Sequence, residues 1–332
     1  SPIVSLNNDW QGSVQLLDVS KLIVSSTEDI LDGIEPAINF LVQGEDDQAI
    51  ASQISSGERV VELLELGQGR FLKASETLVM AGQQLDNIDL TAISSDLLLN
   101  LTQIQSFHVQ LTTMNDVLMA SPDILSQVMG IDEEVAYLIL AQNNDEIRPS
   151  GGYISTYGWL TVRNGRVTDY DYSPTTATSP RPPNESFVDT FEIPDWWIDF
   201  GNPIYAAWDG SWYADFPSTA ELALNYYNEG QNPNFPVDGI IAIDITGFEL
   251  ILGSLGDVIV PDYNRVVNVK NFRDVVYDIR TYGDSEHKRF LAAVYQAIFA
   301  DWQSVEQDSS SGLLTAMLEA VTQRHIMIYI PD

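Results

Sequence analysis

The sequence predicts a helical N-terminal region, residues 1–130, followed by an α/β domain, residues 131–332. Up to about residue 129 the apolar residues recur at the three- and four-residue spacing of amphipathic helices. After residue 131 they fall in short runs or alternate, as in strands, and helices follow between the strands. Such alternation is typical of a sheet that helices cover on both faces.

The helical region should contain two or three long helices packed as a hairpin or bundle. Turn formers and helix-capping residues cluster at residues 44–47, 84–89 and 121–123, so the helices should end there. An apolar stripe along a helix usually belongs to a core. The clearest such stripe consists of Val60, Leu63, Leu64, Phe71, Leu72, Leu78 and Val79.

In the α/β domain, strands are predicted at residues 135–140, 153–162 and 167–172, with Asn164-Gly165 as a hairpin turn. A Ser-, Thr- and Pro-rich stretch at about residues 174–186 should form an exposed loop. The later elements are a helix at 218–228 with Ser218 or Thr219 near its cap, strands at 237–245, 258–260 and 325–330, and helices at 246–255, 269–282, 286–303 and 312–323.

The composition excludes several classes of function. With 48 acidic against 15 basic residues, the net charge is -33, which repels nucleic acid and anionic membrane surfaces. The chain has no Cys, and its three His are far apart in sequence, so a zinc enzyme is disfavoured. The apolar runs are shorter than the roughly 20 residues that a membrane helix needs. Because the chain starts at Ser1 without Met, we expect an anchor or signal upstream.

Two loops hold the candidate binding residues. A polar loop follows the buried strand at 135–140, and the carboxyl end of a strand is where α/β domains usually hold a ligand. The second loop, residues 207–217, mixes aromatic and acidic side chains, which suits the stacking of sugars. The candidates are Asn143, Asn144, Asp145, Arg148 and Ser150 in the first loop and Asp209, Trp212 and Asp215 in the second.

Structural roles are the alternative for these residues. Arg148 could pair with Asp145 or Glu146 or bind a carbonyl, and the second loop could be pinned by buried aromatic rings. Asp169 and Asp171 lie two apart on a predicted strand and share one face, where they would suit Ca²⁺ or simply form a solvated face.

Four segments, covering roughly residues 122–332, carry a family resemblance. They read SPDILSQVMGIDEEVAYLILAQNNDEIRPSGGYIS from Ser121, DFPSTAELALNYY from Asp215, VDGIIAIDITGFELILGSLGDV from Val237 and QRHIMIYIPD from Gln323. In order and spacing they resemble an uncharacterised bacterial cell-surface domain, a domain of unknown function, which is itself distantly similar to the LytR-CpsA-Psr cell-envelope ligases. The resemblance implies an α/β sandwich with a mixed sheet like that of the ligases. It also implies that the third segment lines a polyprenyl-lipid pocket.

The ligase relatives imply transfer of a glycopolymer from a polyprenyl pyrophosphate, with arginines and an Asp around a magnesium-bound pyrophosphate. Arg148 takes the place of one ligase Arg, and Asp145 is a loosely aligned candidate for the magnesium side. The other ligase arginines would fall at residues 172–175 and 283–286, which contain none. Arg280, Lys288 and Arg289 nearby are only loose substitutes.

We therefore expect an extracytoplasmic, membrane-anchored cell-envelope or surface protein that is non-catalytic. It would bind an envelope glycopolymer, its polyprenyl carrier or a protein partner through residues 143–152 and 207–217. One alternative is a Mg²⁺-dependent glycopolymer phosphotransferase that uses Asp145 and Arg148. A second is a structural subunit of a surface assembly or membrane complex that associates through its helices. No cofactor is required, although Mg²⁺ or Ca²⁺ is compatible with Asp145, Asp169 and Asp171.

Overall fold

The chain divides into two compact units, residues Ser1–Asp132 and Glu133–Asp332. The boundary expected from the sequence, between residues 130 and 131, lies two residues before this division. The computed structural model describes residues 2–43, 56–88, 94–174, 181, 210–232, 236–278, 284–303 and 307–331. Most of the loop expected at residues 174–186 and the expected helix end at residues 44–47 lie outside them.

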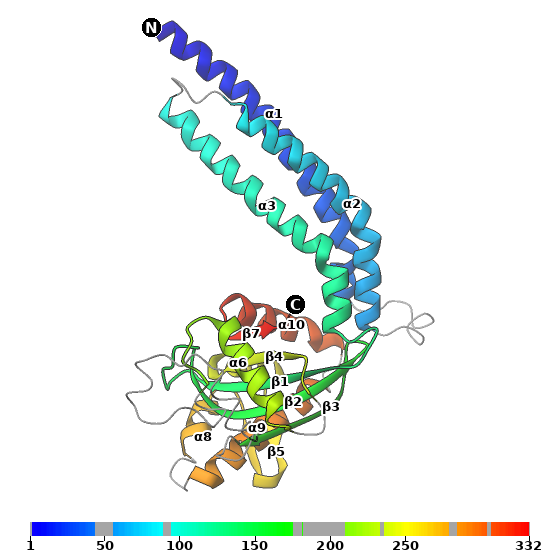
Figure 1. Ribbon diagram of the computed structural model, residues 1–332, viewed down its shortest axis with the longest axis vertical. Coiled ribbons are helices and arrows are strands. Elements are labelled where there is room, and N and C mark those ends of the chain that lie inside the picture. The colour runs from blue at the N-terminus through cyan, green and yellow to red at the C-terminus, as the bar shows by residue number, and fades with distance from the viewer. Residues whose placement is uncertain are drawn as a thin grey trace. The chain divides into compact units, whose positions relative to one another are not determined.

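Three long helices form the N-terminal unit: α1 (Pro2–Gln43), α2 (Ser56–Asp86) and α3 (Ser95–Val128) (Figure 1). Helices α1 and α2 run antiparallel, because Leu16 shares a cluster with Leu85 near one end while Ala37 packs on Val60 near the other. Along α2 the buried residues recur at alternating steps of three and four, the spacing of coiled-coil packing. They include Val60, Leu64, Phe71, Ala74, Leu78, Ala81 and Leu85.

Two residues of the predicted core stripe lie outside the core. Leu72 is 53% exposed and Val79 is 57% exposed, whereas the other members of the stripe are buried. Each follows a buried residue, Phe71 or Leu78, and one step along a helix turns the side chain by about 100°. The prediction was therefore wrong for these two residues, because a hydrophobic neighbour of a seam residue need not face the partner helix.

Helices α1 and α2 approach each other closely at two glycines. A Cβ on Gly67 would lie 2.4 Å from the carbonyl oxygen of Gly33, and a Cβ on Gly33 would lie 2.6 Å from the ring of Phe71. The absence of both side chains leaves room for Phe71, which is fully buried. The backbones therefore meet directly at this point.

A buried carboxylate also joins α1 to α2. Asp29, on α1, is 3% exposed and accepts hydrogen bonds from Lys73 Nζ at 2.9 Å and Arg70 Nη1 at 3.0 Å. The hydrogen bond from Lys73, opposed by burial and aided by Arg70, lowers the pKa of Asp29. The ion pairs fix the register of the two helices at this level.

Helix α3 continues to Val128, so the break expected at residues 121–123 is wrong. Pro122 lies inside the helix and cannot donate to the carbonyl of Leu118. That carbonyl accepts instead from the Ser121 hydroxyl at 2.8 Å, with the Gln68 amide at 3.5 Å. These replacement donors satisfy the carbonyl that Pro122 leaves free, and the helix passes through the proline.

The second unit is built on a mixed sheet of five strands in the order β3-β2-β1-β4-β7. Strand β1 pairs in parallel with β4, whereas β2 with β1, β3 with β2 and β7 with β4 pair antiparallel. The mixed sheet that the resemblance implies is thus confirmed. The strands are β1 (Val135–Asn143), β2 (Tyr153–Arg163), β3 (Arg166–Pro174), β4 (Gly239–Asp244) and β7 (Ile326–Tyr329).

The hairpin between β2 and β3 turns at Asn164 and Gly165, as predicted. Their φ angles are 53° and 71°, and two successive positive values define the type I′ turn that favours Asn-Gly. A separate hairpin consists of β5 (Val258–Val260) and β6 (Arg265–Val267), of which only β5 was predicted. Strand β5 is an uninterrupted apolar run, Val-Ile-Val, whereas β6 is equally short but begins with Arg265 and has two exposed residues.

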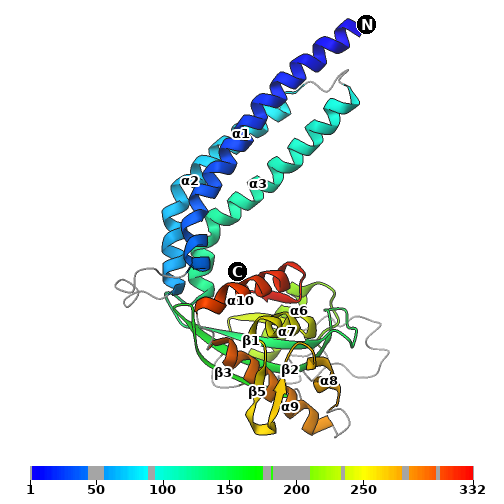
Figure 2. The ribbon, with the colours of Figure 1, turned by 180° about the vertical axis from the view of Figure 1, so that it is seen from behind.

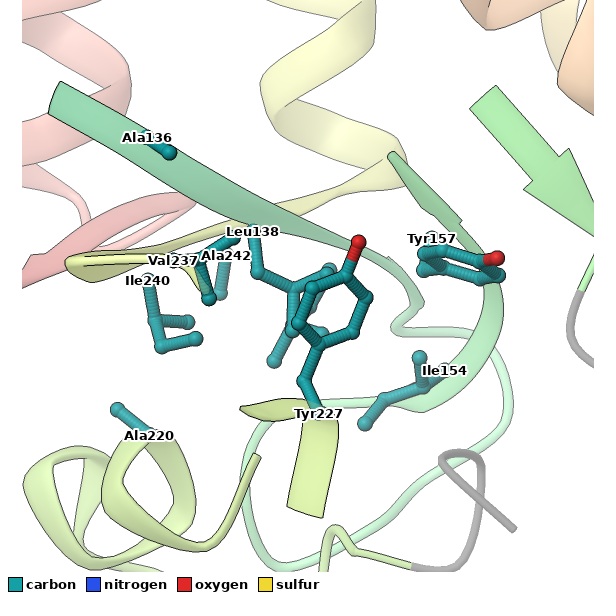
Figure 3. Close-up of a cluster of buried hydrophobic side chains, with 10 residues drawn as sticks. Ala136, Leu138, Ile154, Tyr157, Ala220, Tyr227, Val237, Ile240 and Ala242 are labelled. Carbon is teal, nitrogen blue, oxygen red and sulfur yellow. The ribbon is translucent and has the colours of Figure 1, made fainter. Parts of the chain in front are cut away.

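Helices cover both faces of the sheet, as expected. Helix α6 (Phe216–Glu229) covers one face, where its Ala220 and Tyr227 pack on Leu138 and Ile240 (Figure 3). The other face is covered by α7 (Ile245–Leu255), α9 (Asp284–Gln303) and α10 (Gln307–Thr322) (Figure 2). The short α8 (Phe272–Asp278) is all that the described residues show of the helix expected at 269–282. No described helix has the length and apolar character needed to cross a membrane.

The close approach at Gly67 leads to a prediction. Gly67→Ala should lower the free energy of unfolding by about 1–3 kcal/mol, because its methyl group would overlap the Gly33 carbonyl. Gly69→Ala, on the same helix with no atom within 4 Å of the new Cβ, is the matched control. It should raise stability by about 0.5–1 kcal/mol through helix propensity. Urea unfolding followed by circular dichroism measures both, and equal effects would contradict this packing.

Candidate functional site

The carboxyl ends of β1 and β4 lie side by side, because these two strands are parallel. Ligand sites in α/β sheets usually form outside such ends. Polar side chains from the loop after β1, the start of α7, the helix α8 and the residue before β7 meet here through hydrogen bonds. We call this group the carboxyl-edge cluster: Asn144, Asp145, Asp244, Thr246, Glu249, Arg273, Tyr277 and His325.

Arg273 is bound by two carboxylates at once. Its Nη1 lies 2.7 and 2.6 Å from the two carboxylate oxygens of Asp145, and its Nε lies 2.7 Å from Glu249 Oε1. The Nη2 group donates to Glu249 Oε2 at 3.0 Å and to Thr246 Oγ1 at 3.2 Å. Glu249 first, and then Asp145, raise the pKa of the Arg273 guanidinium against the opposing effect of burial. The positive charge is therefore neutralised within the protein.

Asp145 has a second donor besides Arg273. The Tyr277 hydroxyl donates to Asp145 Oδ2 at 2.6 Å, and this bond is the largest cause of the lowered pKa of Asp145. Burial, followed by the bond to Asp145, raises the pKa of Tyr277 to about 12. Asp145 is thus held ionised, and the loop after β1 is tied to α8 across 128 residues of sequence.

Asp244 organises the other half of the cluster. Its Oδ1 accepts from the backbone N–H of Gly247 at 2.8 Å and so caps the first turn of α7. Its Oδ2 accepts from Asn144 Nδ2 at 3.0 Å and lies 2.8 Å from His325 Nδ1. One buried carboxylate therefore connects the ends of β1 and β4 to the start of β7.

The cluster as a whole is acidic. Asp145 and Glu249 share one guanidinium, that of Arg273, and Asp244 lies beside the imidazole of His325. Among the described residues, no group of three His, Cys, Asp or Glu is arranged to hold a metal ion. The arrangement can position the loop and offer carboxylate oxygens to hydrogen-bond donors. It has little capacity to neutralise a pyrophosphate, which needs positive charge that is not already paired.

The structure separates Arg148 from Asp145. Arg148 Nη1 donates to the carbonyl of Ile147 at 3.0 Å, and its guanidinium lies 5.4 Å from the ring centroid of Tyr153. Arg148 thus binds a carbonyl, one of the structural roles weighed for it, while Asp145 takes Arg273 and Tyr277 as its partners.

Asn143 and Ser150 shape the same loop from inside, and both are buried. Asn143 Oδ1 accepts from the N–H of Asp145 at 3.1 Å, and its amide donates to Glu146 Oε1 at 3.2 Å. The Ser150 hydroxyl accepts from Gln142 Nε2 at 3.1 Å. Asn143 Oδ1 also accepts from the Tyr277 hydroxyl at 3.4 Å, so three candidates of this loop, Asn143, Asn144 and Asp145, contact the carboxyl-edge cluster.

The second candidate loop is described from residue 210 onward, so Asp209 lies outside the described residues. Trp212 is 3% exposed and packs with Leu222 and Tyr213, which buries the ring face that a sugar would need. Asp215 caps α6 by accepting from the Ser218 N–H at 2.9 Å and hydroxyl at 2.6 Å. These bonds lower the pKa of Asp215. The cap is therefore Asp215, and Ser218, one of the two residues expected near the cap, is its donor.

Asp169 and Asp171 are exposed on β3. Each carboxylate accepts a hydrogen bond from the N–H of the next residue, Tyr170 at 2.9 Å or Tyr172 at 2.8 Å. Thr161 and Trp159 are their partners on β2. Both carboxylates therefore lie on the solvent-exposed side of β3.

Sequence reasoning did not identify most of the carboxyl-edge cluster. The Asp at the end of a predicted strand, directly before a helix, is a capping signal that marks Asp244. Arg273 and Tyr277 give no local signal, because they lie four apart on a short helix more than a hundred residues from Asp145.

An apolar cavity of about 100 Å³ lies between the sheet and helices α7, α9 and α10. Three of its lining residues, Ile243, Phe248 and Ile326, directly adjoin cluster members in the sequence. Phe248 stacks on Tyr295, with ring centroids 4.2 Å apart. Ile328, on β7, lines the cavity and is 52% exposed, so the cavity reaches the surface near this strand.

A family model described as "Protein of unknown function (DUF4012)" matches residues 132–278. The matched stretch runs from just before β1 to the end of α8, and it contains Asn144, Asp145, Asp244 and Arg273. No curated protein matches this chain. The family description names no activity.

The bond between Tyr277 and Asp145 leads to a second prediction. Tyr277→Phe removes the largest cause of the lowered pKa of Asp145, so that pKa should rise toward the ordinary value for Asp. An NMR titration of the Asp145 carboxyl carbon measures this change. Tyr263→Phe, a change to a ring that packs on Phe290, is the control and should leave the pKa of Asp145 unchanged.

The same change should alter the pH dependence of stability. A carboxyl whose pKa is lower in the folded state stabilises the fold above its unfolded pKa, and this contribution is lost as the pH falls through the folded value. The acid-induced loss of stability should therefore be smaller in Tyr277→Phe than in the wild type. An unchanged Asp145 pKa in this variant would show that the hydroxyl does not hold the carboxylate.

Proposed function

We propose that the α/β unit is a binding module of a cell-envelope or surface protein, and that it holds the polyprenyl carrier of an envelope glycopolymer without transferring the polymer. The observation that carries the proposal is the apolar cavity beside the carboxyl-edge cluster. One segment of the prenyl chain would enter the cavity near Ile328, and the polar head would remain outside.

The size and lining of the cavity suit this ligand. An apolar cavity of about 150 Å³ stays dry and takes up benzene, so one of about 100 Å³ matches roughly one five-carbon isoprene unit. Its walls are aliphatic and aromatic side chains from the sheet and three helices. Burial of an apolar chain there is favourable by about 25 cal/mol for each Å² removed from water.

The charges of the site favour binding over transfer. A Mg²⁺-dependent phosphotransferase, the alternative, would need positive charge to neutralise the leaving pyrophosphate. Arg273 is already bound by Asp145 and Glu249, and Arg148 lies over the Tyr153 ring. Both arginines would have to leave these partners, and the remaining carboxylates would repel the phosphates.

The proposal places the protein outside the cytoplasm, with a membrane anchor in a segment beyond these 332 residues. Its support here is the resemblance of roughly residues 122–332 to an uncharacterised cell-surface domain that is distantly similar to the envelope ligases. The net charge of -33 is compatible with a soluble surface domain. No cofactor is needed for binding, and Mg²⁺ or Ca²⁺ at Asp145, Asp169 or Asp171 is not part of the proposal.

A binding measurement with a cavity variant tests the proposal. Ile328→Trp places a large ring at the exposed rim of the cavity, and Ile259→Trp makes the same change at a 62% exposed position on β5 that does not line it. A fluorescent farnesol analogue should bind saturably to the wild type and to Ile259→Trp. It should bind at least about tenfold more weakly to Ile328→Trp, because the ring occupies the rim.

Two results would overturn the proposal: no saturable binding to the wild type, or equal weakening in both variants. The alternative is tested with a polyprenyl-pyrophosphate-linked glycan and Mg²⁺. If the wild type turns over this substrate and Arg148→Ala does not, the protein is a transferase and the proposed binding function is wrong.

A further inference from the structure

Helix α1 carries a second apolar row, on its exposed side. Trp10, Leu17, Val24, Leu31 and Ile38 recur at intervals of seven residues, and their exposed fractions range from 45% to 72%. We call these five residues the outer seam. A soluble protein rarely leaves such a row uncovered unless another surface packs on it.

The buried side of α1 already has its own repeat. Leu16, Val19, Ile30 and Ala37 face the clusters that α1 forms with α2 and α3. The outer seam is therefore not the row that holds the three helices together. Helix α1 has two apolar rows, and the helices described in this unit cover one of them.

The seven-residue period indicates that the missing partner is a helix. A straight α-helix drifts by about 20° per heptad from a strict seven-residue repeat, and supercoiling around a second helix removes that drift. The outer seam keeps this repeat over four heptads. In the described parts of α2 and α3, exposed large apolar residues seven apart occur only in pairs: Leu72 with Val79, Phe107 with Met114, and Val117 with Ile124.

We propose that the outer seam is a self-association surface, on which α1 of a second copy of this chain packs in antiparallel orientation. With a twofold axis at Val24, Trp10 of each copy meets Ile38 of the other, and Leu17 meets Leu31. Every residue of the outer seam then contacts another residue of the outer seam. Such an isologous contact is the commonest way in which soluble proteins form dimers.

Charge supports the antiparallel orientation. Lys21 is the only basic residue of α1, which also carries Glu28 one heptad later. In the antiparallel pairing, Lys21 of each copy lies beside Glu28 of the other copy. In a parallel pairing in register, Lys21 would lie at the level of the other Lys21, and Glu28 at the level of the other Glu28. The present partner of Lys21 is Asp18, at 2.8 Å in an exposed pair that exchanges at little cost.

The positions between seam residues also suit close packing. Ser20 and Thr27 lie three residues after Leu17 and Val24, and their hydroxyls donate to the carbonyls of Leu16 and Ile23, both at 2.8 Å. They therefore bring no unpaired donor into the contact, so their burial carries no penalty for a lost hydrogen bond.

The available area fits a reversible dimer. With the neighbouring Val14 and Leu41, which are also exposed, the outer seam offers on the order of 600 Å² per copy, or about 1,200 Å² in a dimer. This value is at the lower end for specific interfaces, so we expect association in the micromolar range, about 1–100 µM. The inference does not depend on the proposed ligand, because the outer seam lies in the helical unit.

Sedimentation equilibrium of the full chain tests the self-association. The wild type should pass from monomer to dimer as its concentration rises. The double variant Leu17→Glu with Leu31→Glu places carboxylates opposite each other and should weaken association about 100-fold or more. Leu72→Glu with Val79→Glu, an equally exposed pair on α2, is the matched control and should associate like the wild type.

Cysteine cross-linking tests the orientation, because the chain has no native Cys. A mixture of Leu17→Cys and Leu31→Cys should form a disulfide-linked dimer, and Leu17→Cys alone should not. A wild type that stays monomeric up to about 1 mM, or a dimer that survives Leu17→Glu with Leu31→Glu, overturns the proposal. A dimer that cross-links through Leu17→Cys alone overturns the antiparallel pairing.

Discussion

The α/β unit depends on the pairing of β1 with strands on both of its edges. All but the first of its nine residues are buried, and its neighbours are β2, antiparallel, and β4, parallel. A strand with both faces buried needs helices on each side of the sheet, which α6 supplies on one face and α7, α9 and α10 on the other. The same pairing brings the ends of β1 and β4 together, so the carboxyl-edge cluster and the cavity both follow from it.

The helical unit obeys a different constraint, the close packing of α1 on α2. Buried side chains spaced three and four residues apart pack against each other along both helices. Gly33 and Gly67 let the two backbones touch at the level where Phe71 is buried. Asp29 adds a polar register contact through Lys73 and Arg70. Both cations are about half exposed, so water weakens these ion pairs. They therefore contribute less to the stability of the unit than to fixing one register of α1 against α2.

The elements that the sequence predicts well are those whose signals are local. The apolar run of β1, the strand patterns of β2 and β3 and the Asn164-Gly165 turn depend on neighbouring residues, and the structure confirms them. The break predicted at Pro122 was wrong because the carbonyl that the proline leaves free finds other donors, the neighbouring Ser121 hydroxyl and the Gln68 amide of α2, and the second of these lies far away in sequence. Arg273 was missed for the same reason, since only the fold brings it to Asp145. The loop after β1 was located correctly, but its partners depend on tertiary contacts that no short pattern encodes.

The long sequence separation between β1 and β4 also determines the order in which the protein can fold. Tyr137 pairs with Gly239, about a hundred residues later, so β1 leaves the ribosome well before its parallel neighbour exists. The hairpin of β2 and β3 covers only one of its edges in the meantime. During synthesis the other edge of an almost entirely apolar strand is therefore open to wrong pairing, and chaperones that shield exposed edges would act at this stage.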